Sequence, residues 1–169
     1  MPGFVTSESG VGTPKRWIGT RRANDPCEAV TEFAGGHLGP EKGILFYDSA
    51  CGFCRWCVAK VLAWDRGRLI VPLAIGSPES EVLLASVEPD RRLASWHFRD
   101  PSETVFSAGA AFAPLLRLLP GGSPVAALAS RFPNGVERAY RVVARHRDFL
   151  GSLLGSRARA RADRRLAAR

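Results

Sequence analysis

The feature that most constrains this chain is a pair of cysteines placed where a short apolar run gives way to a helical pattern. The run at residues 43–48 has the apolar character of a buried strand. Residues 50–65 then carry apolar side chains at helical spacing, with Cys51 and Cys54 near the start. A second apolar run at residues 68–73 completes a strand–helix–strand unit. Such a unit implies a parallel pair of strands joined by a right-handed crossover.

The chain from there to residue 150 extends this unit into an α/β domain. A short helix, a hairpin and three helical stretches follow, and the residues between the hairpin strands are turn formers. The order β-α-β, α, β-β-α predicts the α/β class with a mixed sheet and additional C-terminal helices. The expected elements are helix 78–86, strands 94–98 and 103–106 around a turn at 99–102, and helices near 108–119, 124–132 and 136–150.

The position of the cysteine pair predicts redox chemistry. A Cys-x-x-Cys motif near a β-α-β pattern is typical of a redox centre, because unpaired amides and the helix dipole stabilise a thiolate at a helix start. We therefore expect Cys51 to be the exposed nucleophile and Cys54, three residues further into the helix, to resolve the mixed disulfide. Cys57 lies about 9 Å along the helix axis from Cys51, too far for a disulfide. We expect Cys57 to pack in the core.

A metal site is the main alternative. Cys51, Cys54 and Cys57 have the spacing of the first three ligands of a ferredoxin-type cluster, although no fourth cysteine follows at the required position. A zinc site would need Cys27 or His97 as its fourth ligand, and both are distant in sequence. We favour the redox interpretation, in which the domain itself needs no cofactor. A third possibility is a non-catalytic interaction module with the same fold.

An Asp-x-x-Cys-x-x-Cys signature is present in Tyr47-Asp48-Ser49-Ala50-Cys51-Gly52-Phe53-Cys54, and it is reinforced by Val71-Pro72-Leu73 and by the stretch from Tyr140 to Arg147. On these residues the chain resembles the DCC family of thiol–disulfide oxidoreductases, which is named for this signature. The similarity runs from about residue 43 to residue 151. It implies a thioredoxin-like fold and protein-disulfide reductase activity on a disulfide-containing protein or a small thiol substrate, with a separate electron donor.

The chain departs from thioredoxins in front of the third strand. Thioredoxins have a cis-proline there, beside the redox pair, whereas this sequence has Arg91-Arg92-Leu93. The nearest proline, Pro89, comes too early to take that place. A smaller departure is Ser49-Ala50, where members of the DCC family often have Gly-Asp before the first cysteine.

Asp48 has two possible roles at the predicted site. It could cap the helix start or the preceding turn, which we favour, or it could be buried near Cys54 and accept the proton of the resolving thiol. Arg55 could favour a thiolate at Cys51 or face the solvent. We expect packing or structural roles for the two nearby tryptophans and for two of the histidines, which are Trp56, Trp64, His97 and His146.

The sequence divides into three parts by composition. Residues 1–40 are rich in Gly, Ser, Thr and Pro and predict a disordered leader; residues 41–152 form the domain, and residues 153–169 are a basic Arg/Ala-rich tail. Residues 157–169 carry six arginines and one aspartate, a large share of the net charge of +8. We expect this stretch to be solvated and poorly ordered. We also expect it to keep the protein soluble rather than to make weak contacts with nucleic acid or anionic surfaces.

The sequence also gives a prediction of the cellular compartment. It shows no signal peptide and no apolar window of the ~18 residues that a membrane span needs. We therefore expect a cytoplasmic protein whose thiols stay mostly reduced. In that compartment a close cysteine pair is more often catalytic or metal-binding than structural.

Overall fold

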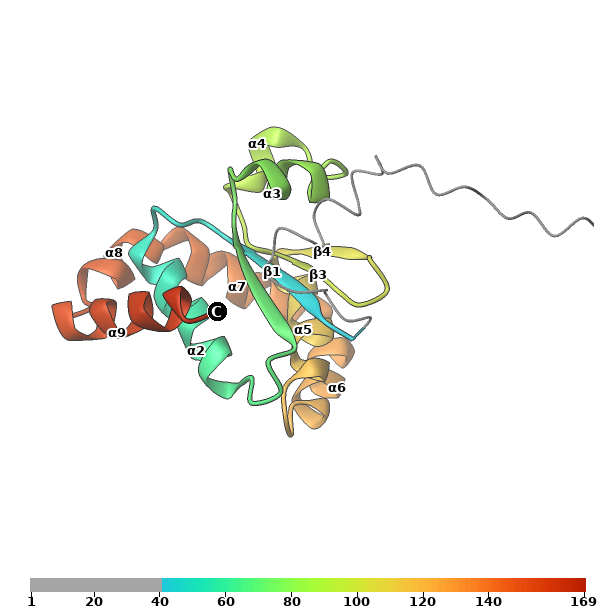
Figure 1. Ribbon diagram of the computed structural model, residues 1–169. Helices are drawn as coiled ribbons and strands as arrows, with labels where there is room; N and C mark the ends of the chain where they lie inside the picture. The colour runs from blue at the N-terminus through green and yellow to red at the C-terminus, as the bar shows by residue number, and fades with distance from the viewer. Residues whose placement is uncertain (1–40) are drawn as a thin grey trace, which may run out of the picture.

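A four-stranded mixed sheet lies at the centre of the computed structural model, which describes residues 41–169 (Figure 1). Strand β1 (Gly43–Tyr47) pairs in parallel with β2 (Ile70–Ala74) and antiparallel with β3 (His97–Arg99). Strand β4 (Val105–Ser107) pairs antiparallel with β3, so the order across the sheet is β2-β1-β3-β4. These directions confirm the predicted α/β class and are consistent with a thioredoxin-like fold. The leader predicted for residues 1–40 lies outside the described residues.

Strand β1 is buried by packing on both faces of the sheet, which explains its uninterrupted apolar sequence. On one face Leu45 and Phe98 are fully buried in a cluster with α2 (Gly52–Trp64) and helices from the second half of the chain. On the other face Ile44 and Phe46 pack with residues that follow β2, including Leu84. The strand that precedes the cysteine pair is therefore held from both sides.

Two short helices follow β2. Helix α3 (Pro78–Leu83) is capped by Ser77, whose hydroxyl oxygen accepts a hydrogen bond from the amide of Ser80 at 3.2 Å. Helix α4 (Pro89–Arg92) is a single turn that the sequence did not predict, because four residues are too few to show a helical period. The predicted helix 78–86 therefore ends early, and a second turn of helix follows it.

The hairpin predicted around residues 99–102 is confirmed, although its strands are shorter and begin later than expected. The side chain of Asp100 organises the turn. Its Oδ1 accepts hydrogen bonds from the amides of Ser102 and Thr104, both at 3.0 Å. At the other end of the hairpin, residues just before β3 line a pocket beside α2.

The second half of the chain is helical. Its elements are η1 (Ala108–Ala111), α5 (Phe112–Leu118), α6 (Ser123–Arg131), α7 (Pro133–Arg145) and α8 (Arg147–Ser152). The single helix predicted at 136–150 is interrupted at His146, whose φ of −103° and ψ of 12° lie outside the helical range. None of the helices in the described part of the chain is long and apolar enough to cross a membrane.

Helix α7 approaches η1 closely at Gly109. A Cβ atom at this position would lie 2.6 Å from the Cα of Glu137, well inside van der Waals contact. The Gly109 amide also donates a hydrogen bond to Oε2 of Glu137 at 2.9 Å. A residue without a side chain is therefore required for α7 to lie where it forms one wall of the site.

The prediction that residues 157–169 are poorly ordered is wrong, although most of them are exposed, as expected. Most of them belong to helix α9 (Ser156–Ala167), which lies along α2 (Figure 1). Ala162 is 4% exposed, and Leu166, four residues later, packs against the core. The apolar stripe of α9 consists mainly of alanines, which allow close approach of two helices but give little periodic signal among so many arginines.

Arg169, which follows α9, anchors this part of the chain to the end of α2. Its guanidinium pairs with the buried carboxylate of Asp65 at 2.9 Å and donates to the carbonyl oxygens of Leu62 and Asp65. The Asp65 carboxylate also accepts hydrogen bonds from the amides of Leu69 and Ile70, both at 3.0 Å. One buried carboxylate thus joins α2, the start of β2 and the residues after α9.

Replacing Arg169 with Ala should lower the free energy of unfolding by about 1.5–3 kcal/mol, because the buried Asp65 carboxylate loses its charged hydrogen-bond partner. Urea unfolding followed by circular dichroism measures this quantity. The matched control is Arg164→Ala, an exposed arginine of α9, which should change stability by less than about 0.5 kcal/mol. Equal effects of the two substitutions would contradict the anchoring role of Arg169.

Candidate active site

Cys51 is the N-terminal cap of α2. Its backbone is extended (φ −82°, ψ 110°), and its Sγ accepts a hydrogen bond from the amide of Cys54 at 3.2 Å. That amide is one of the donors that a helix leaves unpaired at its start, and the positive end of the helix dipole lies at the same place. The geometry that starts the helix therefore also favours a negative charge on the Cys51 sulfur.

Asp48 holds the turn between β1 and α2. Its Oδ1 accepts hydrogen bonds from the amide of Ala50 at 2.9 Å and from the amide of Cys51 at 3.3 Å. Within the described residues, both hydrogen bonds of this carboxylate go to backbone amides of the turn, which is the turn-capping geometry favoured by the sequence. Asp48 thereby sets the direction in which the chain enters α2.

Cys54 lies one turn further along α2 and is half-buried. Burial raises the pKa of its thiol far above the ordinary value, and the hydrogen bond with Cys51 and the charge of Cys51 raise that pKa further. The positive charge of Arg147 lowers the Cys54 pKa, and the negative charge of Asp48 adds a smaller increase. Cys54 is therefore a protonated thiol at neutral pH.

Cys57 does not pack in the core as predicted. It is half-buried and lines a pocket together with Cys54. Burial raises the pKa of the Cys57 thiol to about 11, and the charge of Cys51 contributes to this increase. The buried face of α2 is supplied by neighbouring apolar residues, among them Val58 and Leu62.

The described cysteines do not form a metal site. All three are free, and among residues 41–169 no three Cys, His, Asp or Glu side chains converge as a metal site would require. His97, one candidate for the fourth ligand, is buried with both ring nitrogens hydrogen-bonded, to Oγ of Ser107 at 2.7 Å and to the carbonyl oxygen of Arg92 at 3.0 Å. The other candidate, Cys27, lies outside the described residues. This arrangement gives the metal interpretation no support.

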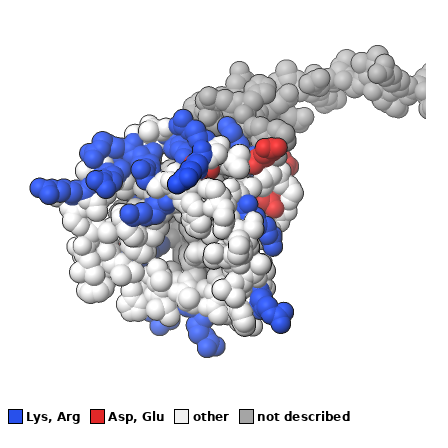
Figure 2. All heavy atoms as spheres, turned by 90° about the horizontal axis from the view of Figure 1, so that it is seen from below, with Lys and Arg blue, Asp and Glu red and all other residues white. Residues whose placement is uncertain are grey.

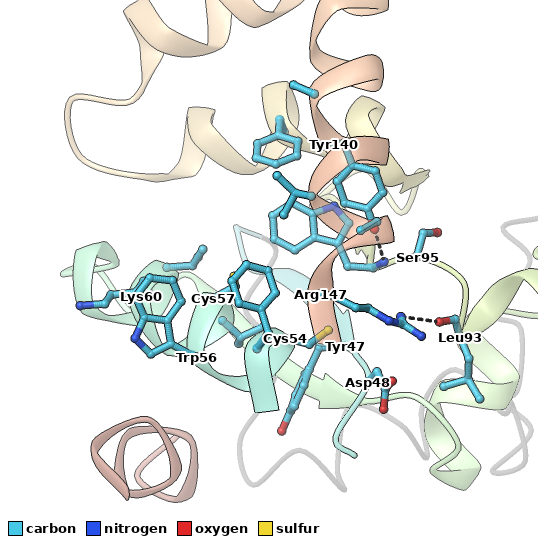
Figure 3. Close-up of a pocket in the computed structure, with 18 of the residues that line it drawn as sticks. Tyr47, Asp48, Cys54, Trp56, Cys57, Lys60, Leu93, Ser95, Tyr140 and Arg147 are labelled. Carbon is cyan, nitrogen blue, oxygen red and sulfur yellow. Dashed lines mark hydrogen bonds between the residues drawn. The ribbon is translucent and has the colours of Figure 1, made fainter. Parts of the chain in front are cut away.

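A pocket of about 520 Å³ opens beside Cys54 and Cys57 (Figure 3). Helices α2 and α7 form much of its wall, and we call it the α2–α7 pocket. Cys51 lies outside its lining. The lining is largely apolar and includes the aromatic side chains of Tyr47, Phe53, Trp56, Trp96, Phe112 and Tyr140.

A family model of DCC1-like thiol-disulfide oxidoreductases matches residues 45–152. The chain belongs to this family. The matched segment runs from β1 to the end of α8, so it contains the cysteine pair and both helices of the pocket and leaves out α9. No curated protein and no solved structure matches the chain.

The DCC1-like domain uses α7 for one wall of the pocket, a role that was not predicted from the sequence. The wall residues are Val136, Tyr140 and Val143 of α7 with Arg147 at the start of α8. Their spacing of three or four residues places the first three on one face of the helix. The stretch from Tyr140 to Arg147 carried part of the family resemblance, and its apolar period is the signal that could have identified the wall.

Trp96 occupies the approach to β3, where thioredoxins have a cis-proline. Leu93, Ser95 and Trp96 line the pocket there, and the peptide bonds of the described residues are all trans. The Trp96 amide donates to the hydroxyl oxygen of Tyr140 at 3.1 Å, and its indole N–H donates to the carbonyl oxygen of Ala108 at 2.9 Å. The DCC1-like domain therefore places an anchored aromatic side chain at this edge of the site.

Two residues next to the cysteines have partners that the sequence did not predict. Arg55 forms an ion pair with Asp163 of α9, so it is not simply directed to solvent. Trp56, expected to be a packing residue, stacks on Phe53 and lines the α2–α7 pocket, with Nζ of Lys60 5.2 Å from its ring centre. Helix α2 therefore lies between the pocket, which Trp56 lines, and α9, which Arg55 contacts.

Trp64 and the two histidines have structural contacts, as predicted. Nε1 of Trp64 donates to the carbonyl oxygen of Pro120 at 2.9 Å, and Nδ1 of His146 lies 2.8 Å from the carbonyl oxygen of Val142. Burial lowers the pKa of His97, so its hydrogen-bonded ring is neutral at physiological pH.

Cys57 should react with iodoacetamide as a thiol of high pKa. Because burial holds its pKa at about 11, fewer than roughly one thiol in a thousand is ionised at about pH 7.5. Its labelling rate should therefore rise about tenfold for each pH unit between about pH 7 and pH 10. Mass spectrometry resolves the rate for each cysteine. A Cys57 rate that levels off below about pH 9 would show that the thiol is not buried as described.

Proposed function

We propose that this chain catalyses thiol–disulfide exchange as a protein-disulfide reductase, with Cys51 as the nucleophile and Cys54 as the resolving thiol. The observation that carries the proposal is the contrast between two sulfurs one helical turn apart. Sγ of Cys51 accepts an amide hydrogen bond at the start of α2, whereas burial raises the pKa of Cys54. Membership of a family named for thiol–disulfide oxidoreductases supports the same chemistry.

In the first step the Cys51 thiolate attacks one sulfur of a substrate disulfide. A bond forms between the Cys51 sulfur and that substrate sulfur, and the substrate's own S–S bond breaks. The second substrate sulfur leaves as a thiolate and takes a proton from water. Cys51 is suited to this step because it begins the helix and lies outside the lining of the pocket.

In the second step Cys54 loses its proton and attacks the Cys51 sulfur of the mixed disulfide. The bond between the Cys51 sulfur and the substrate sulfur breaks as the Cys51–Cys54 disulfide forms. The departing substrate sulfur takes a proton, so the substrate leaves with both sulfurs reduced. This step becomes easier once the mixed disulfide exists, because Cys51 then carries no charge that would raise the Cys54 pKa. The substrate has gained two electrons and two protons, and an external dithiol must reduce the Cys51–Cys54 disulfide before the next cycle.

Asp48 acts in this proposal as a positioning residue. Its hydrogen bonds to the amides of Ala50 and Cys51 hold the turn that presents the nucleophile. The alternative role is acceptance of the Cys54 proton, since Asp48 and Cys54 line the same pocket. The two roles make different demands on the Asp48 side chain, because positioning needs an oxygen that accepts hydrogen bonds and proton transfer needs a carboxylate.

Cys54→Ser should trap disulfide substrates covalently on Cys51, because the mixed disulfide then lacks its resolving thiol. Cys51→Ser should trap almost none, and both variants should lose turnover of insulin disulfides. The matched control is Cys57→Ser on the same helix, which should keep most of the activity. Non-reducing electrophoresis detects the trapped species, and insulin reduction with dithiothreitol as the donor measures turnover.

The opposite trapping pattern would reverse the assigned order of the cysteines. Absence of trapping by either variant, together with no insulin reduction by the unmodified chain, would favour the non-catalytic interaction module. One tightly held zinc or iron per chain in protein purified without chelator would support the metal interpretation instead, because coordinated thiolates are not free nucleophiles.

Asp48→Asn and Asp48→Ala separate positioning from proton transfer. Asparagine keeps an oxygen that can accept from the turn amides, so this variant should retain kcat/KM within about threefold. Alanine removes the acceptor and should lower kcat/KM by roughly tenfold. Steady-state reduction kinetics measure both values. If the asparagine variant loses as much as the alanine variant, Asp48 accepts a proton rather than positioning the turn.

A further inference from the structure

The α2–α7 pocket is larger and more apolar than thiol–disulfide exchange requires. Exchange requires access to the nucleophile, yet about 520 Å³ of largely apolar space lies beside Cys54 and Cys57 instead. This volume is in the range of pockets that hold small molecules, roughly 300–1,000 Å³. Aromatic rings from separate elements converge on it, with the ring centre of Trp96 4.8 Å from that of Phe112 and 6.2 Å from that of Tyr140. The pocket is therefore a preformed apolar cavity.

The two ends of the pocket differ in charge (Figure 3). Asp48 and Arg147 lie at the end near Cys54, where their opposite charges offset each other. Lys60 and Trp56 lie at the other end. Asp48 is the one acidic residue in the pocket lining within the described chain, so the Lys60 end is positive without a balancing carboxylate.

A basic hollow of about 260 Å³ adjoins the Lys60 end of the pocket. Lys60 and Trp56 line both cavities, and α9 supplies Arg157, Arg161 and Arg165 to the hollow. These arginines are four residues apart and therefore form one stripe along α9. Lys and Arg outnumber Asp and Glu on the face of the molecule shown in Figure 2.

The four cations of the hollow have no acidic partner among the described residues. None of the ion pairs of residues 41–169 includes Lys60, Arg157, Arg161 or Arg165. The acidic residue of α9, Asp163, pairs with Arg55 instead. Like charges gathered around one hollow repel one another, and a bound anion would reduce that repulsion.

We propose that this site binds an amphipathic organic anion, with its apolar body in the α2–α7 pocket and its carboxylate at Lys60 and the arginines of α9. A phosphate or a nucleic acid would use the cations and leave the apolar cavity empty, whereas a neutral hydrocarbon would leave the cations unpaired. An apolar carboxylate both fills the apolar cavity and pairs with the cations. Such a ligand lies against Cys54 and Cys57 and leaves Cys51 outside, so its binding does not depend on the exchange activity proposed above.

Isothermal titration calorimetry of the full chain with decanoate tests the site. We expect saturable binding of one decanoate per chain at concentrations below about 1 mM. Decyltrimethylammonium, with the same apolar chain and the opposite charge, should bind at least about fivefold more weakly, and acetate should not bind. Absence of saturable decanoate binding, or equal affinity for decanoate and decyltrimethylammonium, would overturn the proposal.

Val143 and Val142 provide a matched pair of variants on α7. They are 43% and 56% exposed, and of the two only Val143 lines the α2–α7 pocket. Val143→Glu should weaken decanoate binding at least about tenfold, because it places a carboxylate in the apolar lining. Val142→Glu should leave the affinity within about twofold. Equal losses in the two variants would overturn the assignment of the apolar body to this pocket.

Lys60→Gln and Arg161→Gln test the anionic end without changing the apolar lining of α7. Each should weaken decanoate binding about two- to fivefold, whereas Arg164→Gln on the same helix should not. Unchanged affinity in both Lys60→Gln and Arg161→Gln would overturn the proposed place of the carboxylate. Because calorimetry does not require turnover, these results stay distinct from those of the trapping experiment.

Protection of the cysteines gives the position of the ligand directly. Bound decanoate should slow alkylation of Cys57, which lines the pocket, and should leave the alkylation rate of Cys51 unchanged. Equal slowing at both cysteines, or at neither, would overturn the placement of the ligand.

Discussion

Two aspartate carboxylates set the ends of helix α2, and the candidate site depends on both. At the start, Asp48 accepts hydrogen bonds from the turn amides and so delivers Cys51 to the cap position. At the end, buried Asp65 accepts from the amides that open β2 and pairs with Arg169. Because the first side chain fixes where the helix begins and the second fixes where it stops, the three cysteines point in defined directions relative to the sheet.

The difference between the two proposed redox sulfurs follows from depth along one helix. Both residues are half-buried, so Cys51 is less exposed than predicted. Cys51 lies at the cap, where the amide of Cys54 reaches its sulfur, while Cys54 lies about one turn further in and lines the pocket. Burial raises the pKa of Cys54, and a charge on Cys51 raises it again. Cys54 therefore stays protonated while Cys51 is charged, which suits an order in which Cys51 attacks first and Cys54 follows.

The packing of helix α9 against α2 could not be predicted from the sequence. Its arginines dominate the pattern, yet Ala162 is the residue that the fold buries, and small side chains give only a weak apolar period. The helix lies beyond the segment that matches the family, so it adds a layer over α2 to the shared domain. That layer pairs with Arg55 through Asp163 and brings a stripe of arginines to Lys60. The basic hollow thus arises from two helices that are far apart in sequence.

The sequence by itself determined the α/β class, the order of strands around the cysteine pair, the hairpin, and the place of Cys51 at a helix start. These features depend on neighbours within a few residues, such as the apolar run of β1 and the turn formers around Asp100. Only the tertiary structure decided that Cys57 faces a pocket and that Trp96 stands before β3. The pocket wall opposite α2 exists because Gly109 lets α7 approach η1, and contacts across so many residues leave no period in the sequence.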